Sequence, residues 1–415
     1  MRDVVIVGGG PVGILLGILL AVRGVDVEVL EQRSQPSMRS RAIGIHPPSL
    51  GVLEQIGVAD DLIARAVQIR GGVVRCGGRT LGRLSFTEAA APYPFVVALP
   101  QYETEALLRA RFERLRPGGL RQGVTVLGVR DLGDHVEVAT EVAGSGGRAI
   151  RARYVVGADG ARSVVRDALR IGWTSRGRGE TYLMGDFAEA EAEAGADAGG
   201  SAAGLPAPGF AASGVPASIG PGSVAAGARG GEAVLYFERG GVVESFPLPN
   251  GRRRWVAMTA GLATEASSAD LARIIRDRTG VVLPPSADPP SAFSVHQRLA
   301  DRMLAGRISL VGDAAHEISP IGGQGMNLGW LDAVALAPAL ARALADPSEA
   351  GPALAAFDRR RRRSARMATR QAGFNMAMGR PAGGLRLRVR NALVRALAVP
   401  PARGILARAF TMRWL

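Results

Sequence analysis

Three glycines near the N-terminus have the spacing of a phosphate-binding turn. Gly8, Gly10 and Gly13 directly follow residues 4–7, four apolar residues that are typical of a strand buried on both faces. Glycines at this spacing allow a tight turn, close approach of the backbone to a pyrophosphate, and close packing of the next helix on the strand. We expect that helix over residues 14–23, with its N-terminal N–H groups and the positive end of its dipole directed at the phosphates.

A carboxylate further along the chain completes a nucleotide-binding pattern. Glu31 ends a second apolar segment, residues 27–31, where it can accept both hydroxyl groups of an adenosine ribose. Gln32 and Arg33 follow it directly and belong to the same expected site. Because strand, glycine turn, helix, second strand and terminal acid come in this order, the sequence predicts dinucleotide binding. The alternatives, a signal peptide or a membrane span over residues 4–22, conflict with the glycines and the proline within that run.

Two further apolar segments lead into glycine turns that carry an acid. Residues 154–157 precede Asp159, and residues 307–311 precede Gly312 and Asp313. Both segments are typical of buried strands, and the first continues through a turn into a predicted helix. The chain therefore contains three strand-to-turn elements of related design.

The loop after the third element, residues 318–327, combines proline and glycine ahead of a predicted helix. A helix that begins near Gly325 directs its positive end and the N–H groups of Met326 and Asn327 at whatever lies before it. Pro320 fixes the loop in place, and glycines let the backbone lie against a flat ring; these are Gly322, Gly323 and Gly325. The arrangement suits a planar group that carries negative charge, with a plain turn before a helix as the alternative.

Composition limits the classes of protein to which the chain can belong. Its 415 residues suffice for two or three domains, and a hydrophobic fraction of 47% excludes wholesale disorder. The single cysteine, Cys76, permits no internal disulfide, which fits a reducing, cytoplasmic setting. His46 and His135 have no partners at metal-ligand spacing, so we expect no metal site.

The basic residues argue against two further functions. The formal net charge is +14, but every one of the 51 basic residues is Arg, and the absence of Lys excludes a catalytic ammonium or a Schiff base. Aromatic residues make up only 5% of the chain, and no nucleic-acid-binding module is recognisable. We therefore expect no nucleic-acid partner.

The rest of the chain predicts a strand-rich part followed by helices. Alternating apolar residues predict strands within residues 69–86, 124–142, 182–188 and 233–259, with turns at 77–78 and 247–251. Helices are expected over residues 103–115, 270–279 and most of 357–415. Residues 188–231 are rich in Ala, Gly, Pro and Ser, a composition that predicts a mobile insertion or long loop.

The Arg-rich C-terminal region admits two interpretations. Its apolar residues could form a stripe beneath a basic face, namely Leu385, Leu387, Val389, Leu393 and Leu397. Such a helix could lie on a membrane surface. We favour a helix packed on the main body, so membrane contact is not expected.

Together the three strand-to-turn elements resemble those of the class A flavoprotein aromatic hydroxylases, the family of p-hydroxybenzoate hydroxylase and the polyketide hydroxylases. The resemblance covers the chain to about residue 370 and rests on the first glycine turn, on Asp159-Gly160 and on Gly312-Asp313-Ala314-Ala315-His316. The last motif, with Pro320 and residues 322–327, is the most specific, because it combines an acid, a proline and a glycine loop before a helix.

The resemblance implies an α/β fold in which a Rossmann-like FAD-binding domain is joined to a mixed-sheet substrate domain of the p-hydroxybenzoate hydroxylase type, with a helical C-terminus. We expect the FAD-binding domain to comprise residues 1–66, 99–176 and 294–370. The substrate-binding sheet domain would comprise residues 67–98 and 177–293, with a flexible insertion at 189–231, and residues 371–415 would form the C-terminal helical segment.

The resemblance also implies roles for individual residues. Asp313 matches the family acid that hydrogen-bonds the ribityl chain of FAD, Arg41 the arginine at the pyrophosphate, and Gln101 the glutamine on the ribityl side. Asp159 lies in the element that this family links to both FAD and the nicotinamide nucleotide. Gly312, Gly323, Gly325, Met326 and Asn327 complete the expected FAD site.

Several residues admit a functional and a structural role. Arg162 and Arg166 could steer the phosphates of NADPH or form surface salt bridges. Pro320 and Gly323 are expected beside the reactive edge of the flavin, and His296 could either form a wall of the pocket or be a core histidine. His316 closes the turn in the family motif, so we interpret it as structural.

The activity implied by the resemblance is FAD-dependent, NADPH-driven monooxygenation. A flavin C4a-hydroperoxide would deliver one oxygen atom from O2 to an aromatic, phenolic or polyketide-type substrate, in a monomer or a homodimer. Baeyer–Villiger or epoxidase chemistry, or a non-redox cyclase that keeps FAD, remain alternatives. Flavin halogenases need a Lys and a Trp-x-Trp pattern, and this chain has neither.

Overall fold

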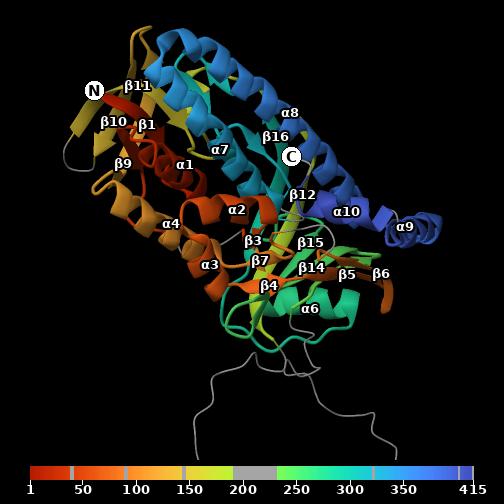
Figure 1. The fold of residues 1–415 in the computed structure, drawn as a ribbon. Helices are drawn as coiled ribbons and strands as arrows, with labels where there is room; N and C mark the ends of the chain where they lie inside the picture. The colour runs from red at the N-terminus through yellow and green to blue at the C-terminus, as the bar shows by residue number, and fades with distance from the viewer. Residues whose placement is uncertain are drawn as a thin grey trace, which may run out of the picture.

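The computed structural model describes residues 1–37, 42–87, 92–142, 146–189, 231–319, 323–400 and 402–413. Arg41, Pro320 and Gly322 lie outside the described residues, as does nearly all of the predicted insertion at 189–231. Two large sheets lie toward opposite ends of the molecule, and the long helix α8 runs along the outside from the first toward the second (Figure 1).

The first sheet has the central parallel strands expected of a Rossmann-like fold. β1 (Arg2–Val7) pairs in parallel with β2 (Val27–Glu31) and with β11 (Gly146–Gly157), and β11 pairs in parallel with β18 (Ile308–Leu310). The other strands of this sheet are β8 (Leu120–Gln122), β9 (Val124–Asp131), β10 (Val136–Val142) and β17 (Leu304–Ala305). The prediction that residues 4–7 form a strand buried on both faces is confirmed.

Helices pack on this sheet and against one another and hold the glycine turns. They are α1 (Pro11–Ala21), α2 (Pro47–Gln55), α3 (Ala59–Arg65), α4 (Gln101–Leu115), α5 (Val164–Ala168), α7 (Gln324–Ala345) and the short η1 (Gly312–Ala314). α1 packs against α4 and α7, and the indole Nε1 of Trp330 in α7 donates to the carbonyl of Pro11 at 3.0 Å. α7 is long and apolar enough to span a membrane by length and composition, but more than half of its apolar window is buried, as in a core helix.

The second sheet is mixed and has its strands in the order β19-β16-β12-β15-β14-β13-β5-β6. Its strands are β5 (Gly71–Cys76), β6 (Arg79–Ser85), β12 (Trp173–Ala188), β13 (Ala233–Glu238), β14 (Gly241–Leu248), β15 (Arg252–Thr259), β16 (Ser291–Ala300) and β19 (His316–Glu317). The expected boundaries at 177 and 294 therefore fall inside strands, because β12 and β16 form one continuous ladder.

Local signals in the second sheet agree with the structure. The predicted hairpin over residues 69–86 is confirmed as β5 and β6, and the predicted break at 247–251 is confirmed as the turn between β14 and β15. Asn250 and Gly251 both have a φ of +61° there, the conformation that an Asn-Gly hairpin turn requires. α6 (Ser268–Thr279) covers the outer face, and the small sheet β3 (Gly44–Ile45), β7 (Val96–Ala98) and β4 (Val67–Ile69) lies between the two large sheets.

The C-terminal region is helical, as predicted, but the predicted stripe does not pack as a unit. The helices are α8 (Pro347–Gly379), α9 (Gly384–Leu397) and α10 (Ala402–Phe410). α9 packs on β6 through Val394, while Leu385, Val389 and Leu393 face outward and are 76%, 59% and 40% exposed. The favoured packing of this helix on the main body is confirmed, since α9 contacts β6, but most of the apolar stripe faces outward.

Candidate active site

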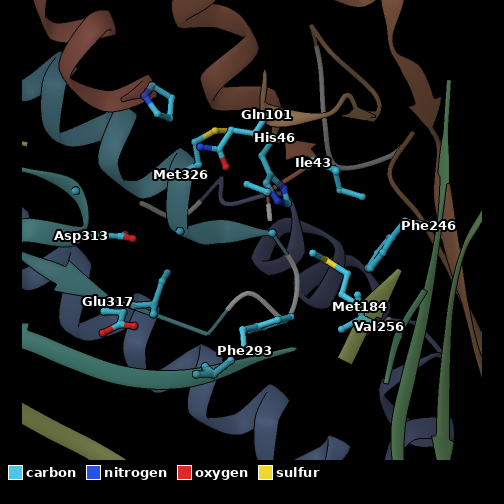
Figure 2. Close-up of a pocket in the computed structure, with 18 of the residues that line it drawn as sticks. Ile43, His46, Gln101, Met184, Phe246, Val256, Phe293, Asp313, Glu317 and Met326 are labelled. Atoms are coloured by element: carbon cyan, nitrogen blue, oxygen red, sulfur yellow. The ribbon is translucent and has the colours of Figure 1, made fainter. Parts of the chain in front are cut away.

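A cavity of about 740 Å³ lies between the two large sheets. Its wall includes the residues that follow β1, β2, β11 and β18 and the inner face of the second sheet. Figure 2 shows Asp313, Glu317 and Met326 on one side and Met184, Phe246 and Val256 on the other. Elements that are far apart in the sequence therefore enclose one space.

The three predicted turns meet at one edge of the first sheet. Val7 pairs with Gly157, and Gly157 pairs with Leu310, so the carboxyl ends of three parallel strands are level. In open α/β sheets ligands bind at the carboxyl ends of the strands. The structure therefore brings the first glycine turn, Asp159 and Gly312 together.

The glycines of the first turn have the geometry that a dinucleotide needs. A Cβ atom on Gly8 would lie 2.4 Å from the carbonyl oxygen of Ala158, and one on Gly13 would lie 2.0 Å from that of Gly8. Gly10, in contrast, has open space on its Cβ side and lines the cavity. Two glycines thus allow close packing and the third leaves room for a ligand beside the N-terminus of α1.

Glu31 stands where the sequence places it, at the end of β2 and in the cavity wall with Gln32 and Arg33. Its Oε2 accepts from the backbone N–H of Gly9 at 2.8 Å, and its Oε1 accepts from Nε of Arg33 at 2.8 Å. Burial opposes ionisation of Glu31, but these hydrogen bonds outweigh it and the pKa is lowered. The carboxylate is therefore a fixed acceptor for a hydroxyl pair.

Asp159 lines the cavity and also organises its own turn. Its carboxylate accepts from Oγ of Ser163 at 2.6 Å and from the N–H of Val165 at 3.2 Å, and burial raises its pKa. Arg162 lines the cavity, whereas Arg166 is buried, donates to the carbonyls of Ala161 and Ala314, and stacks on Trp173. The ion pair of Arg166 with Asp167, at 3.0 Å, matches the salt-bridge alternative, but the side chain is buried and not at the surface.

The third turn is fixed by a buried network. Asp332 of α7 accepts from the N–H of Gly312 at 3.0 Å, from Nε2 of His316 at 2.6 Å and from Nε of Arg361 at 2.7 Å. Burial alone would raise the pKa of Asp332, but its interactions with His316 and Arg361 lower it. Asp313 lines the cavity beside this network, and His316 is fully buried, as a structural histidine should be.

The N-terminus of α7 borders the cavity as expected. Gly323, at a φ of +66°, precedes the helix, and Gly325 and Met326 line the wall with Gln101 of α4 (Figure 2). The side chain of Asn327 points elsewhere: its Oδ1 accepts from the N–H of His46, and its Nδ2 donates to the carbonyls of Gly44 and Gly323. Asn327 thus ties the helix start to the neighbouring strand.

The opposite wall is largely apolar and comes from the second sheet. Met184, Leu235, Phe237, Phe246, Val256, Phe293 and Val295 line it, and helices α9 and α10 add Val394, Leu397, Leu406 and Phe410. His296 on β16 also lines the cavity, so it forms a wall as one of its two interpretations proposed. Transfer of an aromatic or polycyclic molecule from water to such a wall is favourable, because it removes apolar surface from water.

Sequence reasoning missed two polar residues at this site. Arg109 in α4 donates its Nη2 to the carbonyl of Gly9 at 2.7 Å, and its Nε and Nη1 have no partner among the described residues. Glu244 on β14 lies in the apolar wall. Neither Arg109 in α4 nor Glu244 on β14 belongs to a recognisable sequence motif, so no local pattern could have identified them.

Fold and site together define an FAD-binding flavoprotein with the fold of p-hydroxybenzoate hydroxylase. The residues fit FAD, since one cavity is lined by Gly10, with open space on its Cβ side, by the fixed acid Glu31, and by Asp313 with the start of α7. Residues 1–372 match the family described as FAD binding domain, and the chain belongs to it. The resemblance to the flavoprotein hydroxylases is thereby confirmed.

Comparison with individual proteins agrees. The chain is 31% identical over 350 residues to 6-methylpretetramide 4-monooxygenase of Streptomyces rimosus, covering 82% of this chain and 55% of that protein. The first curated relatives it matches are longer, and the chain spans 55% to 62% of their length.

Solved structures show the same fold. p-Nitrophenol 4-monooxygenase PnpA from Pseudomonas putida DLL-E4 superposes with a TM-score of 0.80 at 24% identity, covering 100% of this chain and 97% of that one. The Diels–Alderase PyrE3 of pyrroindomycin biosynthesis superposes with a TM-score of 0.76 at 24% identity, covering 99% and 80%.

Among the residues that the structure describes, no group of His, Cys, Asp and Glu could hold a metal ion.

Proposed function

We propose that this chain is an NAD(P)H-driven, FAD-dependent monooxygenase that adds one oxygen atom of O2 to an aromatic or polyketide-type substrate. The observation that carries the proposal is the continuity of one cavity from the dinucleotide turn to an apolar wall. Both relatives named above as monooxygenases support this reaction class.

The polar wall would hold the cofactor. Glu31 would accept the ribose hydroxyls, the N-terminus of α1 would face the pyrophosphate, and Asp313 would bind the ribityl chain. Gly323 and Met326 at the start of α7 would lie against the isoalloxazine ring, where the helix dipole stabilises negative charge. Bound FAD supplies the acceptance of hydride from NAD(P)H and the activation of O2.

The apolar wall would hold the substrate and exclude water. Phe246 and Phe293, from different strands, can contact the faces and edges of an aromatic ring. Helices α9 and α10 close the cavity on the same side with Leu397 and Phe410. Exclusion of water from such a site protects a reactive oxygen species from premature decay.

The test is a coupled measurement on the FAD-loaded chain. We expect 6-methylpretetramide or p-nitrophenol, the compounds in the names of the two relatives, to stimulate NADPH oxidation and O2 consumption together. With 18O2, one labelled oxygen should appear in the product by mass spectrometry. Oxidation that ligands never stimulate, or products without label, would refute the monooxygenase.

A non-redox cyclase is the second candidate, because PyrE3 shows that this fold is also used by a Diels–Alderase. Such an activity would convert substrate with no consumption of NADPH or O2. The same assay therefore separates the two. The masses and NMR spectra of the labelled products would distinguish hydroxylation from epoxidation and from Baeyer–Villiger insertion.

A further inference from the structure

One carboxyl group on the second sheet, that of Glu244, has a buried oxygen without a hydrogen-bond partner among the described residues. Glu244 lies on β14, opposite Leu235 of β13 and Val256 of β15, and all three side chains line the cavity. It is 4% exposed, and its Oε1 has no hydrogen-bond partner among the described residues. The nearest phenol, that of Tyr182 on β12, also lacks a partner there.

The other acids of this sheet are all partnered. Asp186 forms two hydrogen bonds with Arg254, at 2.7 and 2.8 Å, and Glu180 pairs with Arg380. Glu238 accepts from the N–H of Gly77 at 3.0 Å, and Glu317 pairs with Arg298 at 3.5 Å. Arg254, which lines the same wall, is paired with Asp186, and no salt bridge to Glu244 is present among the described residues.

An unpartnered carboxyl inside an apolar wall has a cost that an apolar residue would avoid. Leaving a buried polar group unsatisfied destabilises the fold, and native proteins contain few such groups. Burial raises the pKa of Glu244 to about 8, so the group is mostly uncharged at neutral pH. A residue of this kind in a ligand cavity is a candidate for contact with the ligand.

We propose that Glu244 hydrogen-bonds a hydroxyl group of the substrate and so fixes the orientation of its ring. This inference rests on the proposed function and narrows the substrate to an uncharged aromatic or polycyclic compound that carries a hydroxyl donor. A ligand whose ring bears a carboxylate would place a second acid beside Glu244, and we expect the site to disfavour it.

The probes are three rings of the same size: 2-naphthol, naphthalene and 2-naphthoate. Each is titrated into the FAD-loaded chain at pH 7, and binding is followed through the visible spectrum of the flavin. The wild-type chain should bind 2-naphthol about tenfold more tightly than naphthalene, the upper range for one hydrogen bond, and 2-naphthoate least. Glu244→Leu should bring the naphthol-to-naphthalene ratio close to one.

Two further variants separate contact from structure. Glu244→Gln keeps a hydrogen-bonding side chain and should retain most of the preference for 2-naphthol. Glu238→Gln, which removes an acid from the adjacent strand but outside the cavity wall, should leave it unchanged. Because Glu244→Leu removes an unpartnered group, it should raise the Tm, whereas a structural acid would lower it.

The results that would overturn the role of Glu244 differ from those that would refute the proposed function. A chain that binds no FAD refutes the function itself. An FAD-loaded chain that shows no preference for 2-naphthol, or a Glu244→Leu variant that keeps the preference, overturns the role of Glu244 alone. A lower Tm in both Glu244 variants also overturns it.

Discussion

The two walls of the cavity recognise ligands in different ways. The wall at the edge of the first sheet is made mainly of backbone: glycine turns, the starts of two helices, and the few side chains, such as Glu31 and Asp313, next to them. The wall on the second sheet is made of single side chains from neighbouring strands, such as Met184, Phe246 and Val256. Backbone contacts suit a cofactor that never changes, and side chains can be exchanged as substrates change.

If this division holds, variants of the first wall should alter FAD affinity, and variants of the second should alter ligand binding while FAD affinity stays constant. A variant of the second wall that lowers FAD affinity would contradict this division between the two walls.

The largest effect is expected at Gly13. A Cβ there would lie 2.0 Å from the carbonyl oxygen of Gly8, so Gly13→Ala must displace the turn itself. We expect FAD affinity to fall on the order of 100-fold, because overpacking against backbone cannot be relieved by a side-chain rotation. The measurement is fluorescence titration with FAD. Gly51→Ala in α2, where the added methyl meets nothing within 4 Å, is the matched control and should bind FAD normally.

The second effect is expected at Asp332, which is buried and accepts from Gly312, His316 and Arg361. Asp332→Asn leaves the buried guanidinium without its counterion, at a cost of about 3 kcal/mol. We expect a lower Tm by thermal unfolding and weaker FAD binding, since the turn that carries Asp313 is loosened. Asp277→Asn, an exposed acid in α6, should change neither, and an equal effect there would contradict the account.

The third prediction concerns pH and the second wall. The folded-state pKa of Glu244 is raised to about 8, so between about pH 4.5 and 8 the unfolded chain is ionised while the folded chain holds the proton. This group therefore lowers stability as the pH rises through that window, by up to about 1.4 kcal/mol per pH unit. Its neighbours are Tyr182 on β12, whose pKa is raised chiefly by burial, so that the phenol stays neutral, and Arg254 on β15, which is paired with Asp186.

The measurement is unfolding of the wild-type chain and of Glu244→Gln by urea at pH 5 and pH 8. The variant should gain stability relative to wild type as the pH rises, and parallel curves would show that Glu244 is ionised in the fold.

The smallest effect is expected at Phe246, an aromatic side chain of the second wall. Phe246→Ala should weaken binding of 2-naphthol about fivefold and leave FAD affinity unchanged, since part of the aromatic contact is lost. Val234→Ala on the opposite face of β13 removes apolar volume outside the cavity and is the control. A drop in FAD affinity in Phe246→Ala would show that the walls are not independent.

The same contrast explains what the sequence could predict. The turns at Gly8, Asp159 and Gly312 were predictable because backbone binding requires glycine and a strand within a few residues, and they stand at one edge as strand pairing dictates. Glu31 was predictable because it ends the second strand. The roles expected for Arg41 and Pro320 remain predictions, because both residues lie outside the described part of the chain.

Other features could not be predicted, because they depend on which strands become neighbours. Glu244 and Val256 are neighbours only through the ladder between β14 and β15, and nothing local marks Glu244 as the unpartnered acid. Arg109 reaches Gly9 across about 100 residues of sequence. The outward stripe on α9 was missed for the same reason, because helical periodicity shows a face but not its partner.

The central claim is that the first glycine turn and the Asp313 turn bind opposite ends of one FAD molecule. The most direct test is calorimetric titration of the flavin-free chain with FAD, ADP and FMN. The account predicts one FAD per chain and an affinity for FAD at least 100-fold higher than for either half. Equal affinities for FAD and for one of the halves, or no binding of FAD, would contradict it.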